Sequence, residues 1–158
     1  MGHGDGQNLL WTQQVAVNRA VINQDYTLAS AVFQAMWGHV AIVPQAGEGV
    51  QRDASFHFHG TILYSGGYGG DYAVNIASYA NITQGTPFQV SGAPLRIMSH
   101  YLLDGQRWMT QTGFGSSNVT RYDVSVKGRE ISALGAASEA AATATCHTPP
   151  VQRALSTD

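Results

Sequence analysis

Two long stretches of helix-forming sequence, separated by only a few polar residues, constrain the fold of this chain more than any other feature. In residues 7–23 and again in residues 26–42, apolar side chains recur at the spacing of one helix face. Residues 23–25 form a short polar break, and Asp25 is suited to cap the second helix. Two apolar helices joined by so tight a turn are expected to form an antiparallel helical hairpin.

The remaining sequence predicts shorter elements, namely helices over residues 72–79 and 94–103, and one strand within residues 120–132. Asp71 is placed to cap the first of these helices. Thr86-Pro87 resembles a helix cap followed by proline at the first helical position. The predicted fold class is therefore mainly α, with long glycine-rich loops and little β structure.

Composition limits the classes of protein and partner. The 158 residues correspond to about one domain. They are 44% hydrophobic but only 11% charged, below the ~25% of typical soluble domains, which indicates a chain buried against something larger. A net charge of −2 predicts no general attraction to nucleic acid or to a membrane surface, so a polyanion would need a local cluster of side chains.

Three further features bear on the compartment. The single cysteine, Cys146, leaves no partner for an internal disulfide. No apolar run approaches the ~20 residues that span a bilayer, and residues 1–6 are polar and glycine-rich, unlike a signal peptide. Glycosylation sequons begin at Asn81 and Asn118, which are compatible with secretion without demonstrating it.

Residues 53–72 hold the groups best suited to moving protons. The segment reads DASFHFHGTILYSGGYGGDY and contains His57, His59 and Tyr68. Glycines flank Tyr68 on both sides, which predicts a tight, exposed turn rather than a place in the core. If residues 56–59 are extended, the two histidines point to one side and the two phenylalanines to the other.

Four polar residues stand in suggestive places, although each has a structural explanation when taken singly. Asn8 begins the first predicted helix, where asparagine is a common cap. His59 is explained as a hydrogen-bonded structural histidine, Tyr68 as a turn aromatic and Arg129 as a surface charge. A functional interpretation therefore depends on the four residues together.

Taken together, these residues resemble one family. Residues 53–69 are similar to the signature of polysaccharide lyase family 8, which includes hyaluronate, chondroitin AC and xanthan lyases: Asp-Gly-Ser-Phe, then a histidine, then Tyr-x-Gly-Gly-Tyr-Gly. Residues 104–109, DGQRWM, are a second match, and residues 122–132 resemble the Gly-Arg-x-Ile-Ser-Arg element. Gly6-Gln7-Asn8 is similar to the Gly-Ala-Asn that opens a toroid helix. The matches follow the family's order through most of the chain.

The resemblance implies a fold and a context. The fold is part of an α/α toroid, built from antiparallel helical hairpins, with residues 1–158 as one partial domain and residues 134–158 as a poorly ordered alanine-rich tail. Family members also carry further toroid hairpins and large β-sandwich domains. Those missing segments are the expected protein partners, and the expected location is extracellular.

The resemblance also implies a reaction, β-elimination on an acidic polysaccharide that contains uronic acid. The C5 proton lies next to a carboxylate and is weakly acidic, so the carboxylate must be neutralised, a base must take the proton and an acid must protonate O4. Asn8 suits the first task, because its amide donates hydrogen bonds where charge develops. With Asn8 and Arg129 covering the charge, the reaction needs no metal or other cofactor.

Two assignments of the proton transfers stay open at this point. A phenol has a reference pKa of ~10, so Tyr68 is a poor base unless Arg129 or protonated His59 lowers its pKa, in which case Tyr68 performs both transfers. Alternatively, neutral His59 is the base and Tyr68 is the acid. Four further residues are expected to bind substrate: Trp11, His57, Arg107 and Trp108.

The chain departs from the family pattern at three places. Ala133 stands where the second arginine of the last element is expected, which removes one contact to substrate or transition state. Ala54 replaces the glycine of Asp-Gly-Ser, and Phe58 replaces the glutamine that commonly precedes the histidine.

Two alternatives to an active lyase remain. In the first, His57 and His59 share one strand face and bind a metal with Asp53 or Asp71, as in a metal-dependent hydrolase. In the second, the chain is an inactive or sugar-binding fragment of a lyase. Isolated toroid hairpins would expose apolar faces that normally pack on their neighbours, which promotes association.

Overall fold

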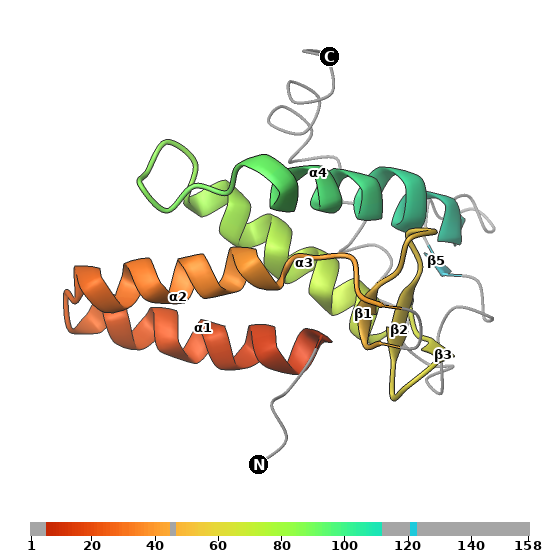
Figure 1. Cartoon of the computed structure of the whole chain (residues 1–158), viewed down its shortest axis with the longest axis horizontal. Coiled ribbons are helices and arrows are strands. Elements are labelled where there is room, and N and C mark those ends of the chain that lie inside the picture. Colours follow the sequence, from red (N-terminus) through yellow and green to blue (C-terminus); the bar gives the residue numbers. More distant parts are fainter. Residues whose placement is uncertain (1–5, 45–46, 112–120, 123–158) are drawn as a thin grey trace, which may run out of the picture.

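The computed structural model describes residues 6–44, 47–111 and 121–122 of the chain. Its long helices are α1 (Gly6–Ile22), α2 (Tyr26–His39), α3 (Tyr68–Ile82) and α4 (Gly92–His100). Figure 1 shows α1 and α2 side by side as a hairpin, α3 crossing beside them and α4 lying across the top of the view. A small three-stranded sheet within residues 49–63 lies at the right-hand end of the same view (Figure 1). The prediction of a mainly helical fold with an antiparallel hairpin is confirmed.

The hairpin forms as its sequence predicts. Asp25 caps α2, because its carboxylate accepts a hydrogen bond of 2.9 Å from the backbone N–H of Leu28. α2 ends at His39, three residues before the predicted limit. Beyond that point the chain is extended, and Ile42 forms a bridge with Val50. The helix therefore gives way to contact with the sheet.

The sheet has three short antiparallel strands: β1 (Gly49–Val50), β2 (Phe56–Phe58) and β3 (Ile62–Leu63). β2 lies in the middle. Its side chains alternate as expected, since Phe56 and Phe58 are buried while His57 between them is half-buried. A second pair, β4 (Thr110–Gln111) and β5 (Arg121–Tyr122), confirms strand structure at the start of the predicted segment.

The core joins the hairpin to the rest of the described structure through aromatic rings. Phe33 of α2 stacks on Trp37 and on Phe88, with ring centroids 6.2 and 5.2 Å apart. The indole N–H of Trp37 also donates a 2.7 Å hydrogen bond to the carbonyl of Phe88. The ring stack and the hydrogen bond at Phe88 together hold the connection between α3 and α4 against α2.

Two predictions for the middle of the chain are wrong. α3 begins at Tyr68 rather than at residue 72, so Asp71 lies in its first turn and does not cap it. Thr86-Pro87 begins no helix. Instead, the Thr86 hydroxyl accepts a 3.2 Å hydrogen bond from the backbone N–H of Phe88, which forms a turn.

The last predicted helix continues in an altered form. α4 ends at His100, and the chain then runs through a π-helical turn (Tyr101–Gly105) and a 3₁₀ turn (Gln106–Met109). The prediction of a helix over residues 94–103 is thus correct in place but not in type at its end. The predictions for residues 134–158 lie outside the described residues.

The end of α4 is tied to the turn that precedes β2. His100 Nδ1 lies 2.9 Å from Asp104 Oδ2, and His100 Nε2 lies 3.1 Å from the carbonyl oxygen of Arg52. When His100 is protonated, both ring nitrogens donate. The hydrogen bond with Asp104 is the main cause that raises the pKa of His100 above its ordinary value.

We therefore expect the His100–Asp104 pair to stabilise the fold in a pH-dependent way. A raised folded-state pKa gives a contribution that is complete below the unfolded value of about 6.5 and is lost as pH rises through the folded value. Urea unfolding of wild type and Asp104→Asn from about pH 6 to about pH 8.5 should show a stability difference that shrinks as pH rises. The effect should be small, because both side chains are exposed and screened. A difference that stays constant with pH would contradict this.

Candidate active site

Tyr68, the first residue of α3, lies within a cluster of aromatic rings from three other parts of the chain. Its ring centroid is 4.0 Å from Phe58, 5.1 Å from Tyr64, 5.4 Å from His59 and 6.0 Å from Trp11. The Phe58 ring stacks on Tyr68, whereas Tyr64 and His59 meet it edge to face. Tyr68 is half-buried, so its ring is held by packing while part of it stays accessible.

His59 reaches this cluster because the backbone turns sharply at its position. β2 ends at Phe58, and His59 has φ +55°, followed by Gly60 with φ +83°. A non-glycine residue rarely adopts this left-handed conformation. The ring of His59 therefore contacts Phe58, Tyr64 and Tyr68. β2 ends at Phe58, so the alternation of side chains along the strand does not extend to His59. The prediction that His57 and His59 point to the same side is therefore wrong.

α1 brings Asn8 and Trp11 to the same region. They are three residues apart and so lie on one helix face, and both side chains are exposed. The neighbouring Gln7 is fully buried, which shows that Asn8 is on the outward side of the first turn. Asn8 is the third residue of α1 and is not its cap. Its amide makes no side-chain hydrogen bond to another described residue.

Hydrogen bonds from buried side chains hold the glycine-rich loop before Tyr68 in place. The hydroxyl of Tyr101 donates a 2.7 Å hydrogen bond to the carbonyl of Gly69. The amide of Gln106 donates to the carbonyl of Ser65 at 3.0 Å and to the Tyr101 hydroxyl. The Ser65 hydroxyl in turn accepts a 2.9 Å hydrogen bond from the backbone N–H of Phe56. The loop is therefore a fixed part of the core.

This arrangement corrects the expectation of an exposed turn. The glycines on both sides of Tyr68 are buried. At Gly69 a side chain would not fit, because an added Cβ would lie 2.6 Å from the Tyr101 hydroxyl and 2.9 Å from Phe56 Cβ. Glycine is needed here for close packing rather than for a free surface turn.

Tyr72, one turn along α3 from Tyr68, has a different environment. It is buried against Phe56 and Tyr101, with ring centroids 5.1 and 5.8 Å away. Burial raises the pKa of its phenol above the ordinary value. Tyr72 is therefore a neutral core residue, and Tyr68 is the phenol that faces the cluster with His59.

His57 belongs to other surroundings. The Ser55 hydroxyl donates a 2.7 Å hydrogen bond to Asp53 and lies 3.4 Å from His57 Nε2. The hydrogen bond from the Ser55 hydroxyl is the main cause that lowers the pKa of Asp53. An open hollow of about 1040 Å³ adjoins this group, lined by Ile42, Val43, Pro44, Gln51, Arg52, Asp53 and His57. His57 therefore faces this hollow and does not take part in the ring contacts of Tyr68.

The departure at Ala54 has a clear structural cost. Ala54 has φ +61°, the left-handed conformation that glycine adopts without strain. Strain of this kind costs about 1 kcal/mol or more. The Ala54 methyl group is fully buried, and burying one methyl group contributes about 0.8 kcal/mol. The two effects are of similar size, which explains how alanine is tolerated in this turn.

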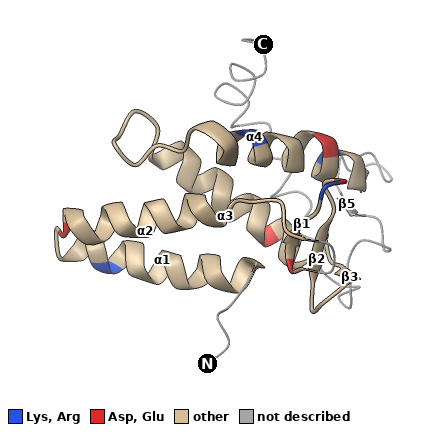
Figure 2. Ribbon diagram, in the orientation of Figure 1, with Lys and Arg blue, Asp and Glu red and all other residues tan. Residues whose placement is uncertain are grey.

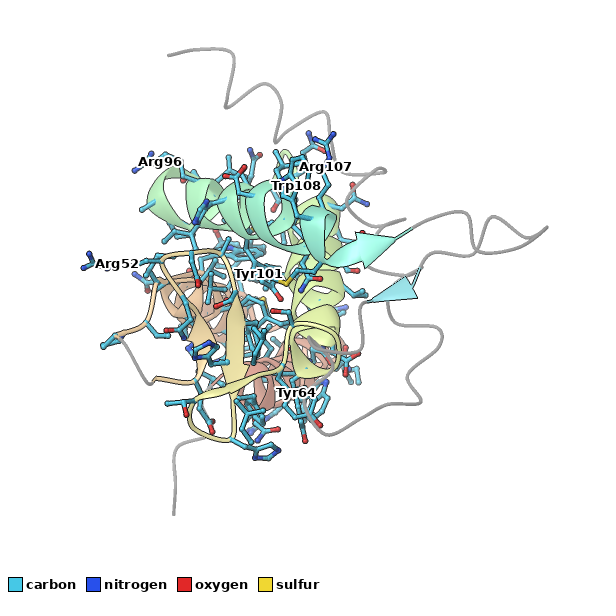
Figure 3. All side chains as sticks on the ribbon, turned by 90° about the vertical axis from the view of Figure 1, so that its right-hand side faces the viewer. Arg52, Tyr64, Arg96, Tyr101, Arg107 and Trp108 are labelled. Carbon is cyan, nitrogen blue, oxygen red and sulfur yellow. The ribbon has the colours of Figure 1, made fainter. Side chains whose placement is uncertain are left out.

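The structure does not gather the remaining predicted residues with Tyr68. Arg107 and Trp108 lie at the opposite end of Figure 3 from Tyr64, whose ring contacts both His59 and Tyr68. The Arg107 guanidinium lies 5.7 Å from the Trp108 ring, and Trp108 is 75% exposed. Arg129 lies outside the described residues.

A metal centre built on the two histidines is not supported by this geometry. His57 and His59 face different surroundings, as described above. Across the described ranges, no group of three or more histidine, cysteine, aspartate or glutamate side chains is placed to hold a metal ion. The pairing of His57 with His59 that the hydrolase alternative requires is therefore absent.

Charge is sparse around the site. Figure 2 shows the acidic and basic residues of the described chain scattered over several elements rather than gathered on one face. An anionic ligand would therefore be held by hydrogen bonds from individual side chains rather than by a broad positive field.

In the part of the chain that the structure describes, no helix is long and apolar enough to cross a membrane.

Sequence reasoning missed the residues that support the site. Tyr101 and Gln106 fix the loop of Tyr68 from more than thirty residues away. Gln106 lies in the DGQRWM segment, so its match to the family was a signal, but its contact with Ser65 could not be read from spacing. Tyr101 looked like one more residue of an apolar helix.

Comparison with solved structures identifies the fold. A structure of chondroitinase AC lyase, from work on that enzyme's active site with oligosaccharide complexes and mutagenesis, matches 91% of this chain with a TM-score of 0.76 and 24% sequence identity. The match covers 21% of the chondroitinase chain. The present chain therefore has the fold of part of that enzyme's helical region. No curated protein matches the chain.

Comparison with protein families identifies the family. Residues 3–147 match the model of the N-terminal α-helical domain of polysaccharide lyase family 8. Because this match spans nearly the whole chain, the protein belongs to polysaccharide lyase family 8. The family resemblance predicted from residues 6–132 is confirmed.

The packing at Gly69 makes a direct prediction about stability. Gly69→Ala should lower the free energy of unfolding by about 1–3 kcal/mol, because the methyl group would overlap Tyr101 and Phe56. Gly38→Ala is the matched control, since an added Cβ at this helical position meets nothing within 4 Å. It should be neutral or stabilise by less than about 1 kcal/mol. Equal effects in urea unfolding would show that the described packing at Gly69 is wrong.

Proposed function

We propose that the chain carries the catalytic site of a lyase that cleaves a uronic-acid polysaccharide by β-elimination. The observation that carries the proposal is the meeting of Tyr68 with His59, edge to face at 5.4 Å, beside the helix face of Asn8 and Trp11. Family membership supplies the reaction class. An imidazole, a phenol and a carboxamide are the groups that this reaction needs.

Asn8 is proposed to bind the uronate carboxylate. Its side chain is exposed in the first turn of α1, and the structure describes no hydrogen bond that competes for its amide. As the C5 proton leaves, negative charge grows on the carboxylate oxygens, and amide N–H donors stabilise that charge. The positive end of the α1 dipole adds a modest contribution at the same place.

Tyr68 and His59 are proposed to move the protons. In one assignment Tyr68 takes the C5 proton and returns a proton to O4, and in the other neutral His59 is the base and Tyr68 is the acid. Their adjacent rings suit both assignments. Arg129 is proposed to stabilise anionic groups in either case.

Trp11 is the proposed sugar platform. Its indole is 42% exposed and borders the ring of Tyr68, so one face of a pyranose ring can pack against it. His57, Arg107 and Trp108 remain proposed substrate contacts only for sugar units remote from the scissile bond, because none of them contacts the Tyr68 cluster.

The site is proposed to work within a larger protein. The chain spans about a fifth of the length of the chondroitinase structure. The outer face of α1 carries an apolar stripe of Val15 and Ile22, which lie seven residues apart on one helix face and are 70% and 80% exposed. We infer that further toroid helices cover this stripe and that the protein acts outside the cell. The alternative is a fragment that binds acidic polysaccharide without cleaving it.

The reaction itself is tested with polymers and absorbance. Hyaluronan, chondroitin and xanthan are each incubated with the chain while the ultraviolet absorbance of the unsaturated uronate product is followed. Tyr68→Phe should abolish product formation, and Tyr26→Phe, an exposed tyrosine on α2, should leave it unchanged. Full activity in Tyr68→Phe would contradict the role of Tyr68. Polymer binding without product would favour the sugar-binding alternative.

The role of Asn8 is tested separately. Asn8→Ala should lower kcat by about 10²–10³-fold, the loss expected when one donor to a developing anion is removed. Asn18→Ala is the matched control, because Asn18 is also an exposed asparagine of α1 but lies about three turns away. If both variants have the same rate, Asn8 does not bind the reacting carboxylate.

A further inference from the structure

Phe58 has an unusual position relative to Tyr68. The two rings lie 4.0 Å apart at their centroids with an interplanar angle of 25°, which is the closest ring pair in the described part of the chain. Phe58 is 1% exposed, so the contact is made in the interior. Because Phe58 has no hydrogen-bonding group, it acts on Tyr68 by contact alone.

The same ring also contacts the start of α1. An added Cβ at Gly6 would lie 3.0 Å from Phe58 Cε2, so the first residue of this helix packs directly on the ring. Gly6 has φ +54° and is two residues before Asn8. A single side chain therefore sets how closely the first turn of α1 approaches the first residue of α3.

Phe58 also contacts His59, the second proposed proton-transfer residue. Its ring meets that of His59 at 4.8 Å and an interplanar angle of 70°. The phenylalanine thus touches both proton-transfer groups and the helix that presents the carboxamide. Position 58 is where the resemblance to the family predicts glutamine, so this chain has an aromatic ring in place of the expected amide.

We propose that Phe58 is a positioning residue for the lyase reaction, holding the Tyr68 phenol and the first turn of α1 at the separation that the sugar requires. This inference rests on the proposed function. Small misplacements of reacting groups reduce rates strongly, with a shift of about 1 Å costing up to ~10²-fold. Leucine or methionine at position 58 would keep the site apolar but would leave the Tyr68 ring without its stacking partner.

The test combines a direct signal from Tyr68 with kinetics. Ring signals are recorded by NMR on protein with ¹³C-labelled tyrosine, and the Tyr68 signals are assigned by their loss in Tyr68→Phe. In wild type the stacked Phe58 ring should shift them upfield. Phe58→Leu and Phe58→Met should remove this shift and lower kcat by about ten- to a hundredfold, with little change in KM. Using two variants guards against the failure of one to fold.

Phe33→Leu is the matched control. Phe33 is also buried and stacked, on Trp37 and Phe88, but it makes no ring contact with the Tyr68 cluster. It should change stability while leaving the Tyr68 signals and kcat unchanged. Unchanged Tyr68 signals in the Phe58 variants, or an equal loss of kcat in Phe33→Leu, would overturn the positioning role. If wild type makes no product, the proposed function fails, and the Tyr68 signals alone then decide whether Phe58 holds that ring.

Discussion

The structure depends on the close approach of the start of α3 to the small sheet and to the turn after α4. Gly69 leaves no room for a side chain between Phe56 and the Tyr101 hydroxyl, and that hydroxyl donates to the Gly69 carbonyl. The glycine-rich loop is buried at this contact, and Tyr68 is the first residue of the helix that follows it. The ring of Tyr68 then meets Phe58, His59 and Trp11, which come from β2, the β2–β3 turn and α1.

The sequence allowed good prediction wherever local patterns decide the structure. The hairpin of α1 and α2 and the Asp25 cap follow from helical spacing and cap chemistry, and both are confirmed. Prediction failed where packing between distant segments decides. α3 begins at Tyr68, next to the Gly69 carbonyl that the Tyr101 hydroxyl contacts, and β2 ends at Phe58, so that His59, with its left-handed φ, lies beyond the strand. No local pattern in residues 53–72 predicts the start of α3 at Tyr68 or the left-handed backbone of His59.

In the candidate site, too, local motifs allowed prediction of some residues, whereas packing between distant segments decided the others. The family motif selected Asn8, His59 and Tyr68. The structure brings the rings of His59 and Tyr68 into contact, and Asn8 lies on the same helix face as Trp11, whose ring is 6.0 Å from that of Tyr68. The same motif gave no indication of the ring stack of Phe58 on Tyr68, because phenylalanine departs from the pattern there. Arg107 and Trp108 were chosen from a matching segment, yet they lie away from the cluster. The motif match therefore selected side chains that lie near one another in the fold, but it did not indicate which residues pack around them.

In the proposed site, one sugar ring binds among Trp11, Asn8, His59 and Tyr68. The most direct test is NMR titration of the chain with an oligosaccharide that contains uronic acid, using the Trp11 and Trp108 indoles, the Asn8 amide and the rings of His59 and Tyr68 as probes. The signals of Trp11, Asn8, His59 and Tyr68 should shift together with a single Kd, while the Trp108 signal changes little. Shifts at Trp108 with none at Tyr68 and Asn8 would contradict it.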